Sequence, residues 1–97
     1  MKKGYWVVVY RSISDESAVN AYGTLAVPAL QPFGGRFLTR SASPLQAHEA
    51  GMQQRVVVVE FDSYEKALAA YESAAYKKAL QALGSGAERD FRIVEGV

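Results

Sequence analysis

The residue types best suited to binding an anion occur in the stretch GGRFLTR at residues 34–40. Alternate side chains of a strand share a face, so the spacing predicts that Arg36 and Arg40 lie on one face. Guanidinium groups form paired hydrogen bonds with carboxylates and phosphates. Arg36 and Arg40 are therefore candidate ligand-binding residues. The alternative is that they are edge-strand charges, which discourage aggregation or pair across a dimer.

A carboxylate interrupts the run of valines in RVVVVEF at residues 55–61. This residue, Glu60, shares its strand face with valines, where partial burial raises the pKa of a carboxyl group unless a cation is close. Glu60 is thus a candidate catalytic base. The alternative is a satisfied ion pair, with Arg92 or Arg36 as the partner.

His48 is the only histidine, and the chain has no cysteine. It is adjacent to Glu49 rather than one helical turn away from another ligand, so no metal site is predicted, and no motif indicates a cofactor. His48 is the second candidate base. A solvent-exposed loop histidine is the simpler interpretation.

Aromatic residues form a third group of candidates. Tyr22, Tyr71 and Tyr76 fall at helical spacing, which is typical of core residues, but their hydroxyls need partners and can point into a cleft between helix and sheet. Trp6 and Tyr10 share a strand face. They are expected to fill the core or a dimer interface, or to line the same cleft.

The elements that must position these residues follow from the apolar pattern. β-branched and aromatic runs predict strands, and apolar residues at helical spacing predict helices. The strands are expected at residues 5–10, 37–40, 55–61 and 89–95, and the helices between residues 14 and 34 and between 62 and 84. This β-α-β-β-α-β order predicts a ferredoxin-like α+β fold in a single domain over residues 1–97, with a four-stranded antiparallel sheet and both helices on one face.

Several positions are expected to shape the helix ends. N-caps are expected at Ser14 or Asp15 for the first helix and at Asp62 and Ser63 for the second. Pro28 lacks an N–H group and predicts a kink or a fresh helical start. Gly34 is expected to end the first helix in a left-handed conformation, and Ser73 to divide the second helix in two.

The sheet face opposite the helices has no predicted segment to cover it. Valines occur on both faces of the strands, and a large apolar side chain left in water forfeits about 1.5–3 kcal/mol. A second copy of the chain, packed sheet against sheet, is the simplest cover. The sequence therefore predicts a homodimer.

Charge and composition exclude several classes of partner. Eleven Lys and Arg residues against ten Asp and Glu give a net charge of +1, which provides no electrostatic case for nucleic acid or an anionic membrane. The first apolar run ends at Arg11, too short for the core of a signal peptide, and nothing approaches the length of a membrane span. With no cysteine, a cytoplasmic location is expected.

Several elements in combination carry a family resemblance. They are Tyr22 and Pro28, FGGRFL at 33–38, E-F-x-S at 60–63, Y-x-S-x-x-Y at 71–76 and IVEG at 93–96. The sequence resembles the small bacterial family catalogued as domain of unknown function 1330 over nearly its whole length. The resemblance implies a dimeric α+β barrel but no reaction. Relatives in that fold include small monooxygenases, haem-degrading enzymes, isomerases and ligand-binding domains.

The chain departs from the family pattern at one position. Many members carry an arginine one or two turns after the position of Tyr76, where this chain has ALQALG at residues 79–84. If that arginine serves a site, Lys77, Lys78 or Arg89 is expected to replace it.

Three functional hypotheses remain open at this point, and whether the protein is an enzyme is undecided. The first is a dimeric domain that binds a small organic ligand, anionic if the arginines bind it, in a cleft between sheet and helices. The second is a cofactor-independent enzyme of the monooxygenase or isomerase kind, with Glu60 or His48 as base. The third is a purely structural or interaction module.

Overall fold

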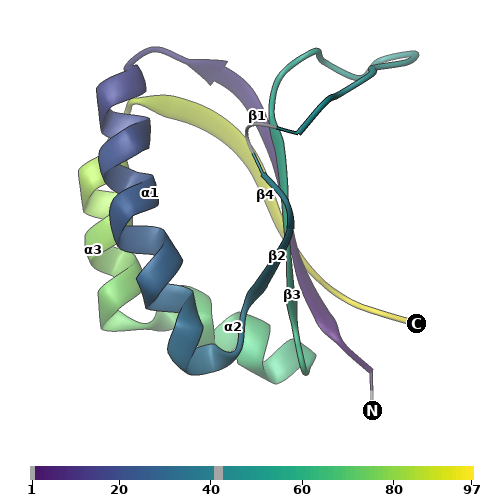
Figure 1. The fold of residues 1–97 in the computed structure, drawn as a ribbon, viewed down its shortest axis with the longest axis vertical. Coiled ribbons are helices and arrows are strands. Elements are labelled where there is room, and N and C mark those ends of the chain that lie inside the picture. The colour runs from purple at the N-terminus through teal and green to yellow at the C-terminus, as the bar shows by residue number, and fades with distance from the viewer. Residues whose placement is uncertain (1, 41–42) are drawn as a thin grey trace.

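The strands and helices follow the predicted order. The computed structural model describes residues 2–40 and 43–97. The elements are β1 (Gly4–Ile13), α1 (Glu16–Leu30), a 3-10 turn (Gln31–Phe33), β2 (Arg36–Thr39), β3 (Val56–Phe61), α2 (Tyr64–Glu72), α3 (Ala74–Leu83) and β4 (Ala87–Glu95). The strands form one antiparallel sheet in the order β2-β3-β1-β4, and the helices lie against one face of it (Figure 1). This confirms the ferredoxin-like α+β fold.

The helix ends are set by local hydrogen bonds. The side chain of Asp15 caps α1 by accepting from the N–H of Ala18. Gly34 has a φ of 72°, the left-handed conformation expected there. Ser73 ends α2 and caps α3, which confirms the predicted division of the second helix. Of the two alternatives at Pro28, the fresh helical start does not occur: α1 continues through Pro28 to Leu30, so the missing N–H affects only the last turn of the helix.

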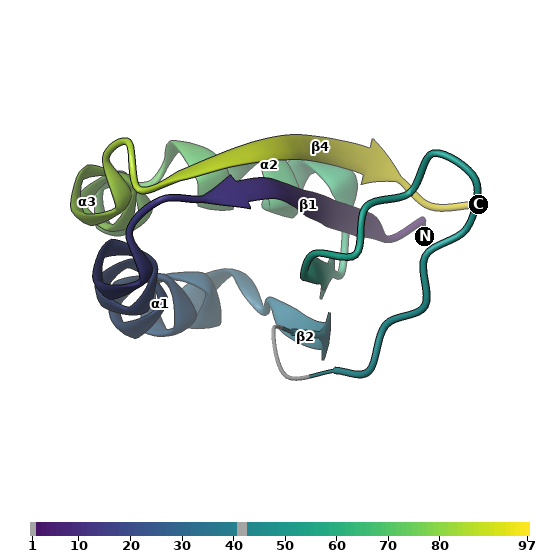
Figure 2. The ribbon, with the colours of Figure 1, turned by 90° about the horizontal axis from the view of Figure 1, so that it is seen from above.

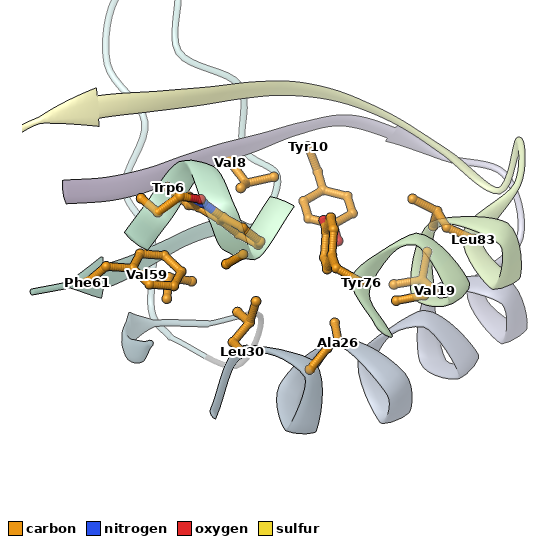
Figure 3. Close-up of a cluster of buried hydrophobic side chains, with 14 residues drawn as sticks. Trp6, Val8, Tyr10, Val19, Ala26, Leu30, Val59, Phe61, Tyr76 and Leu83 are labelled. Carbon is orange, nitrogen blue, oxygen red and sulfur yellow. The ribbon is translucent and has the colours of Figure 1, made fainter. Parts of the chain in front are cut away.

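The core lies between the sheet and the helices. Along β1, Trp6, Val8 and Tyr10 are buried against the helices, and the alternate residues face away. Trp6 is 1% exposed and its indole N–H donates to the carbonyl of Ala67 at 2.8 Å, which ties β1 to α2. Figure 3 shows Trp6 and Tyr10 directed toward the helices. Both therefore belong to the core face, and the alternative of a dimer interface is wrong for them.

In the part of the chain that the structure describes, no helix covers the opposite face of the sheet (Figure 1). It presents Val7, Val56 and Val58, all half-buried, and it is called the outer face below. The connection between β2 and β3 extends on this side, away from the helices (Figures 1 and 2). Its residues 50–52 lie beside Val9 at one end of the face. No helix among the described residues is long and apolar enough to cross a membrane.

Candidate functional site

A cavity of about 210 Å³ lies between α1 and the helix-facing side of the sheet. Its floor is mostly apolar, with Trp6, Val8, Val57 and Val59 from the two central strands. Its roof is the sheet-facing side of α1. The remaining lining residues are Tyr10, Val19, Asn20, Tyr22, Gly23, Ala26, Val27, Phe37, Arg40, Arg55 and Arg89. This space is called the cleft below, and the only charged groups among its described lining residues are guanidinium groups.

Two of these arginines flank one tyrosine across the sheet. Tyr10 on β1 pairs with Arg89 on β4, and its N–H donates to the carbonyl of Arg55, the residue before β3. Each guanidinium carbon lies 5.5 Å from the centre of the Tyr10 ring. Residues in one cross-strand row point to the same face, so both cations are directed toward the cleft. One end of the cleft is therefore cationic above an aromatic ring.

Arg89 is the less compensated of the two. Its guanidinium lies 4.7 Å from the centre of the Tyr22 ring and 5.3 Å from that of Phe91, and the residue is half-buried. Arg55 forms an ion pair with Glu16 at 3.5 Å, whereas within residues 2–40 and 43–97 no carboxylate forms an ion pair with Arg89. Aromatic faces stabilise a cation, and the phenol hydroxyls beside Arg89 are neutral partners for its N–H donors, so they do not balance its charge.

The three candidate tyrosines have different surroundings. Tyr22 lines the cleft, and its hydroxyl lies 2.6 Å from the hydroxyl of Tyr76, which is fully buried. Burial raises the pKa of Tyr76, so this phenol stays protonated. Tyr71 packs against Trp6 and Phe91 and does not line the cleft. Tyr22 is thus in direct reach of a ligand in the cleft, Tyr76 supports it, and Tyr71 belongs to the core.

The expectation that Arg36 and Arg40 share a face is wrong. Arg36 pairs with Glu60 of β3, but the register then shifts between Phe37 and Thr39, where strand pairing is irregular. This irregularity reverses the alternation of side chains. Arg40 therefore lines the cleft, with its guanidinium 5.1 Å from the Phe37 ring, while Arg36 lies on the outer face.

Glu60 also lies on the outer face, in a network of charged and polar groups. Its Oε1 accepts from Arg36 Nη2 at 2.9 Å and its Oε2 from the hydroxyl of Tyr5 at 3.0 Å. Arg36 also donates to Asp62 at 3.2 Å. The hydrogen bond from Arg36, and then that from Tyr5, holds the pKa of Glu60 below its ordinary value. The structure thus contains the predicted ion pair with Arg36.

His48 lies in the connection between β2 and β3 and is exposed. Neither His48 nor Glu60 lines the cleft. A general base must come within hydrogen-bond reach of the proton that it removes. Neither residue is therefore placed to act on a ligand held in the cleft.

Some residues of the cleft were not among the sequence candidates. The sequence patterns indicate neither Arg55 nor Gly23 as a site residue, and they indicate Arg89 only as a replacement for a missing arginine. Arg89 alternates with Phe91 and Ile93, which pack against the core. An arginine in phase with partly buried apolar residues is a signal that could have identified it.

Comparisons with known proteins agree with the geometry of the fold. A protein of unknown function from Rhodopseudomonas palustris has a TM-score of 0.75 at 13% identity, over 99% of this chain and 83% of that chain. A dimeric ferredoxin-like protein of unknown function from Thermobifida fusca has a TM-score of 0.61 at 17% identity, over 99% and 92%. A cofactor-independent oxygenase from Streptomyces nogalater also has a TM-score of 0.61, at 8% identity, over 97% and 92%.

These identities are low, so the structural likeness establishes the fold alone. No curated protein matches the chain in sequence. The sequence profile of one family matches residues 3–97. The chain therefore belongs to the family described as domain of unknown function (DUF1330).

Proposed function

We propose that this protein binds a small organic anion in the cleft between α1 and the sheet. The observation that carries the proposal is the half-buried guanidinium of Arg89, which faces an apolar cavity and is surrounded by aromatic rings. A buried charge is costly unless a partner compensates it. A carboxylate or an equivalent anion supplies that partner and accepts paired hydrogen bonds from the guanidinium.

The size of the cleft supports a compact ligand. Its volume of about 210 Å³ lies below the roughly 300–1,000 Å³ of pockets that hold drug-sized molecules. The apolar floor favours a ligand with a hydrocarbon or aromatic body next to its acidic group. This combination favours a small organic acid over a nucleotide.

A glycine in the roof provides independent support. Gly23 belongs to the sheet-facing stripe of α1, one turn after the buried Val19 and one turn before the buried Ala26. A glycine inside a helix costs about 0.5–1 kcal/mol relative to alanine. No packing requires it here, because a Cβ at Gly23 would meet nothing within 4 Å. We infer that the glycine keeps this part of the cleft open for a ligand.

Two other hypotheses have less support from the described residues. An enzyme with Glu60 or His48 as base requires a ligand outside the cleft, since neither residue reaches it. A purely structural module gives no reason for an arginine that faces a cavity and has no carboxylate partner among the described residues. The ligand-binding hypothesis accounts for both the arginine and the glycine.

We also propose that two copies pair through the outer face. Its valines are only half-buried in a single chain, and the related fold from Thermobifida fusca is described as dimeric. Val58 pairs with Val7 and Thr39 on neighbouring strands, near the middle of this face. In sedimentation velocity experiments we expect Val58→Asp to dissociate the dimer and Leu25→Asp, on exposed α1 surface, to leave it intact. A wild-type protein that sediments as a monomer well above about 1 μM, where an interface worth about 8 kcal/mol is formed, contradicts this proposal.

Thermal shift and calorimetry with benzoate, a compact acid with an apolar body, test the ligand proposal. A ligand that binds only the folded protein stabilises it by RT ln(1 + [L]/Kd), about 2.7 kcal/mol at a hundred times Kd. Hydrogen bonds to a charged group contribute about 1.5–3 kcal/mol, so Arg89→Gln should weaken binding by about 10- to 150-fold. Arg92→Gln is the matched control, because Arg92 lies on the same strand, is exposed and pairs with Asp90.

The possible outcomes distinguish the role of Arg89 from the proposed function as a whole. Loss of binding in Arg89→Gln with retention in Arg92→Gln supports the proposal. Arg36→Gln should also retain binding, since Arg36 lies on the outer face. Equal stabilisation of the wild type and Arg89→Gln overturns the role of Arg89. Failure of benzoate and of a panel of other small acids to stabilise the wild type overturns the proposed function.

A further inference from the structure

The arginines that line the cleft enter it from opposite edges of the sheet. Arg40 directly follows β2 and Arg89 belongs to β4, which are the two edge strands in the order β2-β3-β1-β4. Neighbouring strands lie about 4.8 Å apart, so three spacings separate the two backbones by about 14 Å. Both side chains line the same cavity. The cleft thus has a cationic group on each side rather than one cationic centre.

The floor between these two groups is mostly apolar, although Arg55, which pairs with Glu16, also lies between them across the sheet. Trp6 and Val59 are each 1% exposed, and with Val8 and Val57 they form the floor from the two central strands. Each terminal cation also contacts an aromatic ring, Arg40 that of Phe37 and Arg89 that of Tyr22. The cleft thus offers a guanidinium partner for an acidic group on each side, with mostly apolar contacts and the ion-paired Arg55 between them.

The charges of the cleft are not balanced by the described residues. Three guanidinium groups line it, from Arg40, Arg55 and Arg89. One carboxylate, that of Glu16, pairs with Arg55 at 3.5 Å, and within residues 2–40 and 43–97 neither Arg40 nor Arg89 forms an ion pair. Two positive charges therefore remain, and electrostatic complementarity favours a ligand with two negative charges.

We propose that the cleft takes an elongated dicarboxylic acid, with one carboxylate on Arg89, the other on Arg40, and an apolar or aromatic body on the floor between them. This inference rests on the proposed function and specifies its ligand class. A phosphate monoester also carries two charges, but it concentrates them in one group. It therefore cannot contact cations on both sides of the cleft while its body lies between them.

Calorimetry with four probes tests the inference: terephthalate, its monomethyl ester, benzoate and phenyl phosphate. Terephthalate and its monomethyl ester share the same ring and differ in one negative charge. We expect terephthalate to bind the wild type at least about tenfold more tightly than the ester, since one charge-assisted hydrogen-bonded pair is lost in the ester. In Arg40→Gln the two should bind alike, and Arg92→Gln should behave as the wild type.

The outcomes distinguish this inference from the proposal on which it depends. If the ester or benzoate binds as tightly as terephthalate, the inference of a dicarboxylic acid ligand is overturned, whereas the proposal that the cleft binds an organic anion stands. Tighter binding of phenyl phosphate than of terephthalate also overturns it. If none of the four binds, both proposals fail. Arg40 is exposed, so Arg40→Gln keeps the test decisive even if Arg89→Gln does not fold.

Discussion

Gly23 is the position where the stability of the fold and the proposed binding of a ligand place opposite demands on one residue. Gly23 lies inside α1, and a Cβ added there meets nothing within 4 Å. Replacing it by alanine removes the conformational entropy of a helical glycine and introduces no clash. We expect Gly23→Ala to raise the free energy of unfolding by about 0.5–1 kcal/mol.

A larger residue at the same position should block the cleft. The leucine of Gly23→Leu extends from the sheet-facing stripe of α1 into the space that a ligand would occupy. Overpacking of a filled site costs about 1–3 kcal/mol, so benzoate should bind about 5- to 150-fold more weakly. The matched control is Ala21→Leu, which adds a side chain on the exposed side of the same helix.

Two measurements check this reasoning. Urea unfolding can be followed through the fluorescence of Trp6, the only tryptophan, which is 1% exposed in the fold. Calorimetry measures benzoate binding to the wild type and the two leucine variants. If Gly23→Ala is less stable than the wild type, the result contradicts the presence of open space beside Gly23. If Gly23→Leu binds benzoate as the wild type does, the ligand site lies elsewhere.

Three further predictions concern groups outside the floor of the cleft. Glu60→Gln should lower the Tm more at pH 7 than at pH 3. Arg36 depresses the pKa of Glu60, so the stabilisation is fully present above the ordinary value of 4.5 and is lost as the pH falls through the folded value. An equal change in Tm at both pH values contradicts the ion pair. Gly4→Ala should lower the free energy of unfolding by about 1–3 kcal/mol, because a Cβ there would lie 2.5 Å from a backbone carbonyl oxygen at the start of α2. Urea unfolding measures this change, and an unchanged midpoint would refute the close approach. Tyr76→Phe should lower the free energy of unfolding by about 1 kcal/mol, because it removes the hydroxyl contact with Tyr22. Urea unfolding measures this change as well, and an unchanged stability would indicate that Tyr22 finds another partner.

Much of the fold could be predicted from local sequence. The valine run of β3 and the aromatic and valine run of β1 are strands because β-branched and aromatic side chains fit a pleated sheet. The left-handed conformation of Gly34 and the division of the helices at Ser73 depend on neighbours only a few residues away. Such features are encoded within single segments, and the resemblance to DUF1330 agrees with them along the chain.

The composition of the cleft was decided by tertiary structure. The period of two predicts a common face for Arg36 and Arg40, but the irregular pairing of β2 with β3 places them on opposite faces. Arg55 and Arg89 are 34 residues apart in sequence, and they meet on either side of Tyr10 only because β1 pairs with both β3 and β4. Sequence determined which segments are strands and helices, since that choice is local. Register and strand order determined which charged side chains share a cavity, since those depend on pairing between distant segments.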